Sequence, residues 1–150
     1  MKIAELNDRI GNKNEIAFIF EFKNISNFVN QSDNIFIFPS SFKCHGLEWN
    51  LRVISEDSKT LKFYLVLLSE ILGRYIKVDG SKLTIINQEK KFSDWITNVS
   101  IDNHCGYPRY TNNYKYKEFK ESLTYDYLKN NGFIKDDKII LQFYMKAQNA

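Results

Sequence analysis

The strongest constraint on the fold is an early run in which large apolar side chains recur at every second position. These positions are Ile16, Phe18, Phe20 and Phe22. A period of two places their side chains on one face of a β-strand, whereas a helix would spread them around its circumference. Aromatic residues, which favour pleated and half-buried surfaces, make up 15% of the chain. The pattern therefore predicts a fold built from β-strands.

Further short apolar segments follow, separated by turn residues. The predicted strand segments are Asn34–Phe38, Phe42–Cys44, Trp49–Val53, Leu61–Leu68, Arg74–Val78, Leu83–Ile86 and Lys138–Met145. Trp95–Ile101 and Lys115–Phe119 are expected to be half-buried. We expect a polar loop at Asn24–Asp33, a two-residue hairpin at the Asp79-Gly80 step, and one short helix at Leu123–Leu128, where apolar residues recur with helical spacing.

Seven or eight short strands with little helix imply an all-β fold of two packed antiparallel sheets, a sandwich. Its predicted core consists of the rows Phe18/Phe20/Phe22, Trp49/Leu51/Val53, Phe63/Leu65/Leu67, Leu83/Ile85 and Ile139/Leu141/Phe143. At 150 residues the chain has the size of one domain. We assign residues 1–14 to a poorly ordered leader, 15–146 to the sandwich and 147–150 to a tail.

Composition and motifs exclude several classes of protein. No apolar run reaches the ~18 residues of a membrane-spanning helix, and the first residues carry both charges, unlike a signal peptide. A cytoplasmic or nuclear protein is therefore expected. No glycine-rich phosphate-binding motif occurs, and a net charge of +3 is too small to indicate nucleic acid by itself. We expect no cofactor.

Five segments, taken in order, resemble the MATH or TRAF-like domain family (meprin and TRAF homology). They are Phe20–Phe28, Ser41–Val53, Leu61–Leu67, Leu83–Gln88 and Phe119–Tyr144. The second contains the family spacing G-x-x-W-x-[LI]-x-[VI], and the fourth ends in the family's Asn-Gln pair. The resemblance covers about residues 15–146. It implies an eight-stranded antiparallel sandwich that recognises short extended peptides, commonly as the targeting module of ubiquitin ligases or deubiquitinases.

The resemblance also implies that the peptide lies along a sheet edge and contacts tyrosines there. The implied binding residues are Tyr64, Tyr107, Tyr110, Asn113, Tyr114, Lys115, Tyr116 and Lys117, with the choice between Tyr107 and Tyr110 left open. Lys115 stands where many family members have the glycine of W-G-F, so we expect a different peptide motif. Between positions 107 and 120, four basic residues face one glutamate, which favours acidic or Ser/Thr-rich segments. Without the resemblance, alternating Tyr and Lys would indicate only a solvated strand face.

Two Cys/His pairs, Cys44-His45 and His104-Cys105, call for comparison with a zinc site and a cysteine protease. Neighbouring residues on a strand point to opposite faces, so neither pair readily binds one ion or forms a nucleophile with its base. The Asp136-Asp137 pair fits a turn before the last strand better than a carboxylate site. We therefore expect neither a metal nor catalysis.

A nucleic-acid-binding β domain that uses the basic, tyrosine-rich stretch 107–120 is the alternative function. Peptide binding is favoured because the rest of the chain has no matching basic stripe. Steep weakening by salt would distinguish nucleic acid from peptide. The sequence contains no coiled-coil heptads and no RING, BTB or protease segment. We therefore expect a monomer whose effector is either a partner chain, such as a ubiquitin ligase or deubiquitinase subunit, or a part of the protein outside this sequence.

Overall fold

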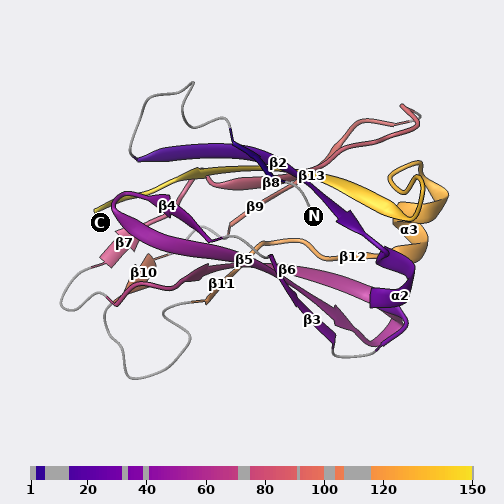
Figure 1. Cartoon of the computed structure of the whole chain (residues 1–150), viewed down its shortest axis with the longest axis horizontal. Coiled ribbons are helices and arrows are strands. Elements are labelled where there is room, and N and C mark those ends of the chain that lie inside the picture. Colours follow the sequence, from indigo (N-terminus) through magenta and orange to yellow (C-terminus); the bar gives the residue numbers. More distant parts are fainter. Residues whose placement is uncertain are drawn as a thin grey trace.

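Antiparallel sheets account for most of the structure (Figure 1). The computed structural model describes residues 3–5, 14–31, 34–38, 41–70, 75–90, 92–99, 104–106 and 116–149, with the backbone alone at 3–5, 58, 75, 104–106 and 116. Within these ranges the helices are α2 (Ile25–Val29) and α3 (Tyr125–Asn130), and η1 (Asp57–Lys59) is a single 3-10 turn. The prediction of an all-β fold is confirmed.

The first sheet has five strands in the order β1-β2-β13-β8-β9. Their bounds are β1 (Ile3–Glu5), β2 (Glu15–Lys23), β13 (Lys138–Lys146), β8 (Lys82–Ile85) and β9 (Trp95–Asn98). Strands β2 and β13 pair along their whole length, so segments from the two ends of the chain lie side by side (Figure 1).

The second sheet has six strands. Their bounds are β3 (Asn34–Ile37), β4 (Phe42–Cys44), β5 (Leu47–Glu56), β6 (Thr60–Leu67), β11 (Tyr116–Glu118) and β12 (Leu123–Thr124). The order is β11-β6-β5-β3, while β12 pairs with β6 and β4 pairs with β5. Because β5 and β6 pair with each other throughout, β3 and β4 share one border of this sheet, and β11 and β12 share the other.

A third, small sheet has the order β10-β7-β14, formed by β10 (His104–Gly106), β7 (Tyr75–Lys77) and β14 (Gln148–Asn149). Strand β7 leads into β8 through the Asp79-Gly80 step, where Ser81 N donates to Val78 O at 3.2 Å. The predicted turn exists, but the predicted hairpin is wrong, because β7 and β8 pair with strands of different sheets. Local turn chemistry does not determine which long-range partner a strand takes.

The core lies between the five-stranded and six-stranded sheets and is dominated by aromatic rings. Phe18 of β2 contacts Phe42 of β4, with ring centroids 5.0 Å apart, and Phe42 in turn lies 5.4 Å from Phe143 of β13. Phe63 of β6 lies 6.4 Å from Trp95 of β9. Every residue of the predicted core rows is buried. Period-two alternation therefore identified the inner faces correctly.

Three local predictions need correction. The predicted loop Asn24–Asp33 contains α2, and the predicted helix Leu123–Leu128 begins with strand β12, so that α3 starts only at Tyr125. In the predicted leader, Ile3–Glu5 form β1 and pair with Phe18–Phe20 of β2. The pairing of β12 with β6 and of β1 with β2 depends on residues far away in the sequence. The remainder of the leader, apart from Asn14, lies outside the described residues.

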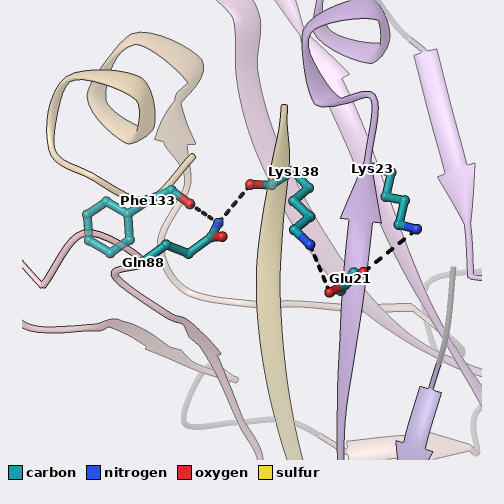
Figure 2. Close-up of polar contacts among 5 residues, drawn as sticks. All are labelled: Glu21, Lys23, Gln88, Phe133 and Lys138. Carbon is teal, nitrogen blue, oxygen red and sulfur yellow. Dashed lines mark hydrogen bonds and ion pairs between the residues drawn. The ribbon is translucent and has the colours of Figure 1, made fainter. Parts of the chain in front are cut away.

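A polar cluster fastens the segment before β13 to the five-stranded sheet (Figure 2). The Gln88 side-chain amide donates to Phe133 O and to Lys138 O, both at 2.8 Å. The Lys138 ammonium also donates to the Glu21 carboxylate at 3.0 Å, and Lys23 lies 3.9 Å from the same carboxylate. Gln88, the last residue of the Asn-Gln pair, therefore has a structural role, because its amide holds the chain on both sides of the turn before β13.

Candidate functional site

The structure describes part of the predicted peptide-binding set. Tyr64 lies on β6, and Lys117 and the backbone of Tyr116 lie on β11. The remaining members, Tyr107, Tyr110, Asn113, Tyr114 and Lys115, lie outside the described residues. The part of the site that can be built is therefore the β6–β11 border of the six-stranded sheet.

Alternate main-chain groups of β11 point away from the sheet. Phe119 N donates to Phe63 O at 3.0 Å. Alternate residues of an antiparallel pair exchange hydrogen bonds, so Lys117, opposite Leu65, is bonded to β6 in the same way. The peptide groups of Tyr116 and Glu118 then face the outer border, where a further strand could accept and donate hydrogen bonds.

This border is short. Immediately after β11, Lys120 N donates to Asn98 O at 2.8 Å, and Val99 forms an isolated bridge with Phe119. The end of β9 thus occupies the border beyond Glu118. Along β11 itself, no strand in the described part of the chain pairs on the outer side. Because Val99 N and Phe119 N are bonded elsewhere, this bridge also engages the Glu118 carbonyl, so a docked segment would meet the outward groups of Tyr116 and the N–H of Glu118.

Tyr64 lies one strand inside this border, because β6 is paired with β5 on one side and with β11 on the other. It stands opposite both Arg52 and Glu118, on the face of the sheet turned away from the core. Its ring is half-buried. Burial raises the pKa of the Tyr64 hydroxyl, and the Glu118 carboxylate raises it further. The phenol stays protonated at neutral pH and can donate a hydrogen bond.

The charges beside Tyr64 are balanced. The Lys62 ammonium lies 3.1 Å from the Glu56 carboxylate and 3.5 Å from that of Glu118. The hydrogen bond to Glu56 and the negative charge of Glu118 raise the pKa of Lys62. Two of the basic residues that gave the predicted positive bias, Arg109 and Lys115, lie outside the described residues. The described border still carries Arg52, Lys117 and Lys120 beside this ion-paired group, so part of the predicted positive bias remains.

Lys117 lies on the opposite face from Tyr64. It is paired with Leu65, whose side chain is buried in the core, whereas Tyr64 faces outward. Lys117 is itself half-buried. A lysine on the inward side of an edge strand opposes unwanted pairing with other strands. The pleat thus separates two residues that the sequence analysis placed together.

The Cys44-His45 pair has structural partners. The Cys44 thiol is buried and donates to Asn14 O at 3.3 Å, and burial raises its pKa to about 11. The His45 ring lies within hydrogen-bond distance of the Asn14 and Asn149 side chains, at 2.7 and 3.0 Å. Among the residues described, no group of three or more His, Cys, Asp or Glu is arranged to hold a metal ion. A neutral, buried thiol is a poor nucleophile and a poor ligand.

The Asp136-Asp137 pair forms the predicted turn before β13. Both residues have a φ of 55°. Asp137 also accepts hydrogen bonds from Ser26 at the start of α2, at 3.0 Å from its N–H and 2.8 Å from its hydroxyl. These contacts give the Asp137 carboxylate a structural role.

A hollow of about 490 Å³ lies on the outer face of the five-stranded sheet. Its lining includes Lys82, Thr84, Asp94, Ile96, Gln142 and Tyr144. Two of its polar groups have partners within the fold, since Asp94 accepts from Asn87 N at 2.8 Å and Tyr144 donates to Glu15 at 3.0 Å. This surface was not predicted from the sequence. Its polar residues alternate with core residues and resemble any solvated strand face.

The other feature missed from the sequence is an apolar border at β3. Ile35 and Ile37 are exposed, at 56% and 50%, on the face turned away from the core. The signal was present, because Asn34–Phe38 is apolar at four consecutive positions and so has no polar face. Such a run marks either a strand buried on both sides or one with an exposed apolar face.

Comparisons with known proteins add no relative. No family model matches the chain, and no curated protein matches it. In the described part of the chain, neither helix has the length or the apolar character needed to cross a membrane.

Proposed function

We propose that this protein is a non-catalytic interaction module that binds a short extended segment of a client protein at the β11 border. The observation that carries the proposal is the outward-facing main chain at Tyr116 and the Glu118 N–H, next to the half-buried ring of Tyr64. An added strand would gain main-chain hydrogen bonds from the first feature and an aromatic contact from the second.

We also propose that the domain is a MATH-type sandwich of eight principal strands. Two features support this. The five-stranded sheet contains β2, β13, β8 and β9 beside the short β1, and the six-stranded sheet has four rows once β12 and β4 are grouped with the strands that share their borders. The hydrophobic core between these sheets forms one cluster that contains the inward-facing residues of β2, β5, β6, β8 and β13.

The client segment is proposed to be acidic or rich in Ser and Thr, and the module to serve as a recognition subunit for a ubiquitin ligase or deubiquitinase in the cytoplasm or nucleus. This part depends on the family resemblance and on the basic residues of 107–120. Arg52 and Tyr64, which lie opposite each other on the exposed face, are residue types that contribute strongly to protein interfaces.

The first experiment is a peptide array probed in low and in high salt, followed by titration of the best peptide. Tyr64→Ala should weaken binding by roughly ten- to a hundredfold, the loss typical of an interface anchor. Tyr127→Ala is the matched control, because it removes another partly exposed tyrosine, on α3. Circular dichroism checks that both variants fold. Equal affinity of the folded Tyr64→Ala variant and the control would reject the site.

A second arm tests strand addition directly. N-methylation of the peptide at alternate residues should abolish binding in one phase of the alternation and leave it in the other, because only every second peptide group faces β11. Equal effects in both phases would exclude strand addition. Tight binding of an oligonucleotide that weakens steeply with salt would replace the proposal with the nucleic-acid function.

A further inference from the structure

Strand β3 forms an uncharged outer border of the six-stranded sheet. Its residues are Asn34, Ile35, Phe36 and Ile37. Ile35 and Ile37 expose 56% and 50% of their surface, and Phe36 is partly buried against the core, stacked on Phe22 with ring centroids 4.6 Å apart. In Figure 1 this strand lies at the margin of its sheet, beyond β5.

The hydrogen-bond register shows which main-chain groups face this border. Phe38 N donates to Leu51 O at 3.1 Å. Pairing alternates along an antiparallel strand, so Phe36 is also bonded to β5. The N–H and C=O groups of Ile35 and Ile37 therefore point away from β5. Among the described strands, none pairs with them on that side.

Two of the other described borders, β9 and β11, differ from β3 in ways that disfavour pairing with an identical strand. At β9 the Asn98 carbonyl already accepts from Lys120 N, and β11 carries Lys117 and Glu118. Charged residues and covered edges are the usual protection against edge-to-edge pairing. Strand β3 has neither a charge nor a covering strand in the part of the chain that is described.

We propose that β3 pairs with β3 of a second copy of this chain, giving a two-fold symmetric dimer in which the two sheets become continuous. With the axis at Phe36, Ile35 stands opposite Ile37 of the second copy, and the reverse pair forms by symmetry. Both pairs consist of residues whose peptide groups face the border, so each pair exchanges two N–H···O hydrogen bonds.

The same register satisfies the side chains. Opposite residues in an antiparallel pair lie on one face, so the four isoleucines form one apolar cluster on the outside of the joined sheet. The two Phe36 rings meet on the other face, beside the core. A foreign strand would need the same uncharged pattern to fit, whereas a second copy always has it, and this selects the occupant.

The dimer is expected to be weak. A strand of four residues spans only about 14 Å, so the contact lies below the size of standard stable interfaces. A monomer was expected from the sequence because it contains no coiled-coil heptads. The absence of heptads does not exclude a dimer that forms through a sheet border.

Sedimentation equilibrium over about 10 μM to 1 mM tests the dimer. The wild-type mass should rise from 17.8 kDa toward twice that value, and Ile35→Lys or Ile37→Lys should raise the dissociation constant at least about tenfold. Ile96→Lys is the matched control, since Ile96 is an isoleucine 48% exposed on β9. A monomer at 1 mM, or a dimer disrupted only by Ile96→Lys, would overturn the proposal.

A covalent arm tests the register. Opposite residues in the proposed pairing have Cα atoms about 5.5 Å apart, within reach of a disulfide. The double variant Ile35→Cys/Ile37→Cys should therefore form a covalent dimer on mild oxidation, well above the level shown by Ile96→Cys. Equal cross-linking in the two variants would refute pairing through β3.

Discussion

At the scale of single residues, Gly132 has less room for a side chain than the other two glycines whose surroundings the structure describes, Gly46 and Gly80. Its φ is +86°, a conformation that disfavours residues with a Cβ atom. A Cβ placed there would lie 2.8 Å from Asn87 Oδ1 and 3.0 Å from Glu89 Cβ. The Asn87 amide cannot easily move, because it donates to Asn131 O at 2.8 Å. The glycine is thus required both by its backbone angle and by its neighbours.

Gly132→Ala should lower the free energy of unfolding by about 2–4 kcal/mol, combining the cost of a left-handed residue with that of overpacking. Gly80→Ala is the control, because Gly80 has a φ of +87° but open space around its Cβ direction. It should lose only about 1–2 kcal/mol. Urea denaturation of both variants measures the difference. Equal losses would show that the contacts with Asn87 and Glu89 have no energetic effect.

At the scale of secondary-structure elements, α2 lies in a segment that was predicted to be a loop. The helix has five residues and no side-chain cap from its own N-cap residue, Asn24. Its first turn is instead held from a distant turn, where the carboxylate and the carbonyl of Asp137 accept from Ser26 and from Ile25 N. A helix this short is not stable through local interactions. The only local signal is the helical spacing of Ile25, Phe28 and Val29, which is too short to predict a helix without the contacts from Asp137.

The anchoring can be tested by removing the charge of Asp137. Asp137→Asn should lower the free energy of unfolding by about 1–2 kcal/mol, because it replaces charge-assisted hydrogen bonds with neutral ones. Asp136→Asn is a close control, since Asp136 is exposed and has the same φ of 55°. Asn tolerates this backbone conformation, so the control should change stability by less than about 0.5 kcal/mol. A similar loss in both variants would contradict the anchoring.

Across the elements, the strands were predicted well and their partners less well. The rows from Phe18 to Phe22 and from Ile139 to Phe143 follow from alternation alone, since an inner face must be apolar at every second position. The partner of β7 depends on segments as distant as Gln148–Asn149, so the Asp79-Gly80 step alone could not predict it. Similarly, the alternation of Tyr and Lys could not show that Lys117 and Tyr64 face opposite sides.

At the scale of the whole molecule, the two larger sheets share one core. Phe18, Phe42 and Phe143 form mutual ring contacts, with centroids 5.0 to 5.4 Å apart, that join three strands from both sheets. The segment after β11 also ties the sheets together at one side, through Lys120 and Asn98. If either sheet unfolded alone, these rings would be exposed to water. Exposure of apolar surface is the dominant free-energy cost of unfolding. The sheets should therefore unfold as one unit.

The two tryptophans report on this separately, because Trp49 lies in the six-stranded sheet and Trp95 in the five-stranded sheet. In Trp95→Phe the fluorescence follows Trp49, and in Trp49→Phe it follows Trp95. Within each variant, the urea midpoint from fluorescence should coincide with the midpoint from far-ultraviolet circular dichroism. Trp49→Phe should be the less stable variant by about 1–3 kcal/mol, since it replaces a fully buried indole with a smaller ring and removes the hydrogen bond from Trp49 Nε1 to Cys44 O at 2.9 Å. A Trp95 signal lost well before the circular dichroism signal would show that the five-stranded sheet opens by itself and that the shared aromatic core does not couple the sheets.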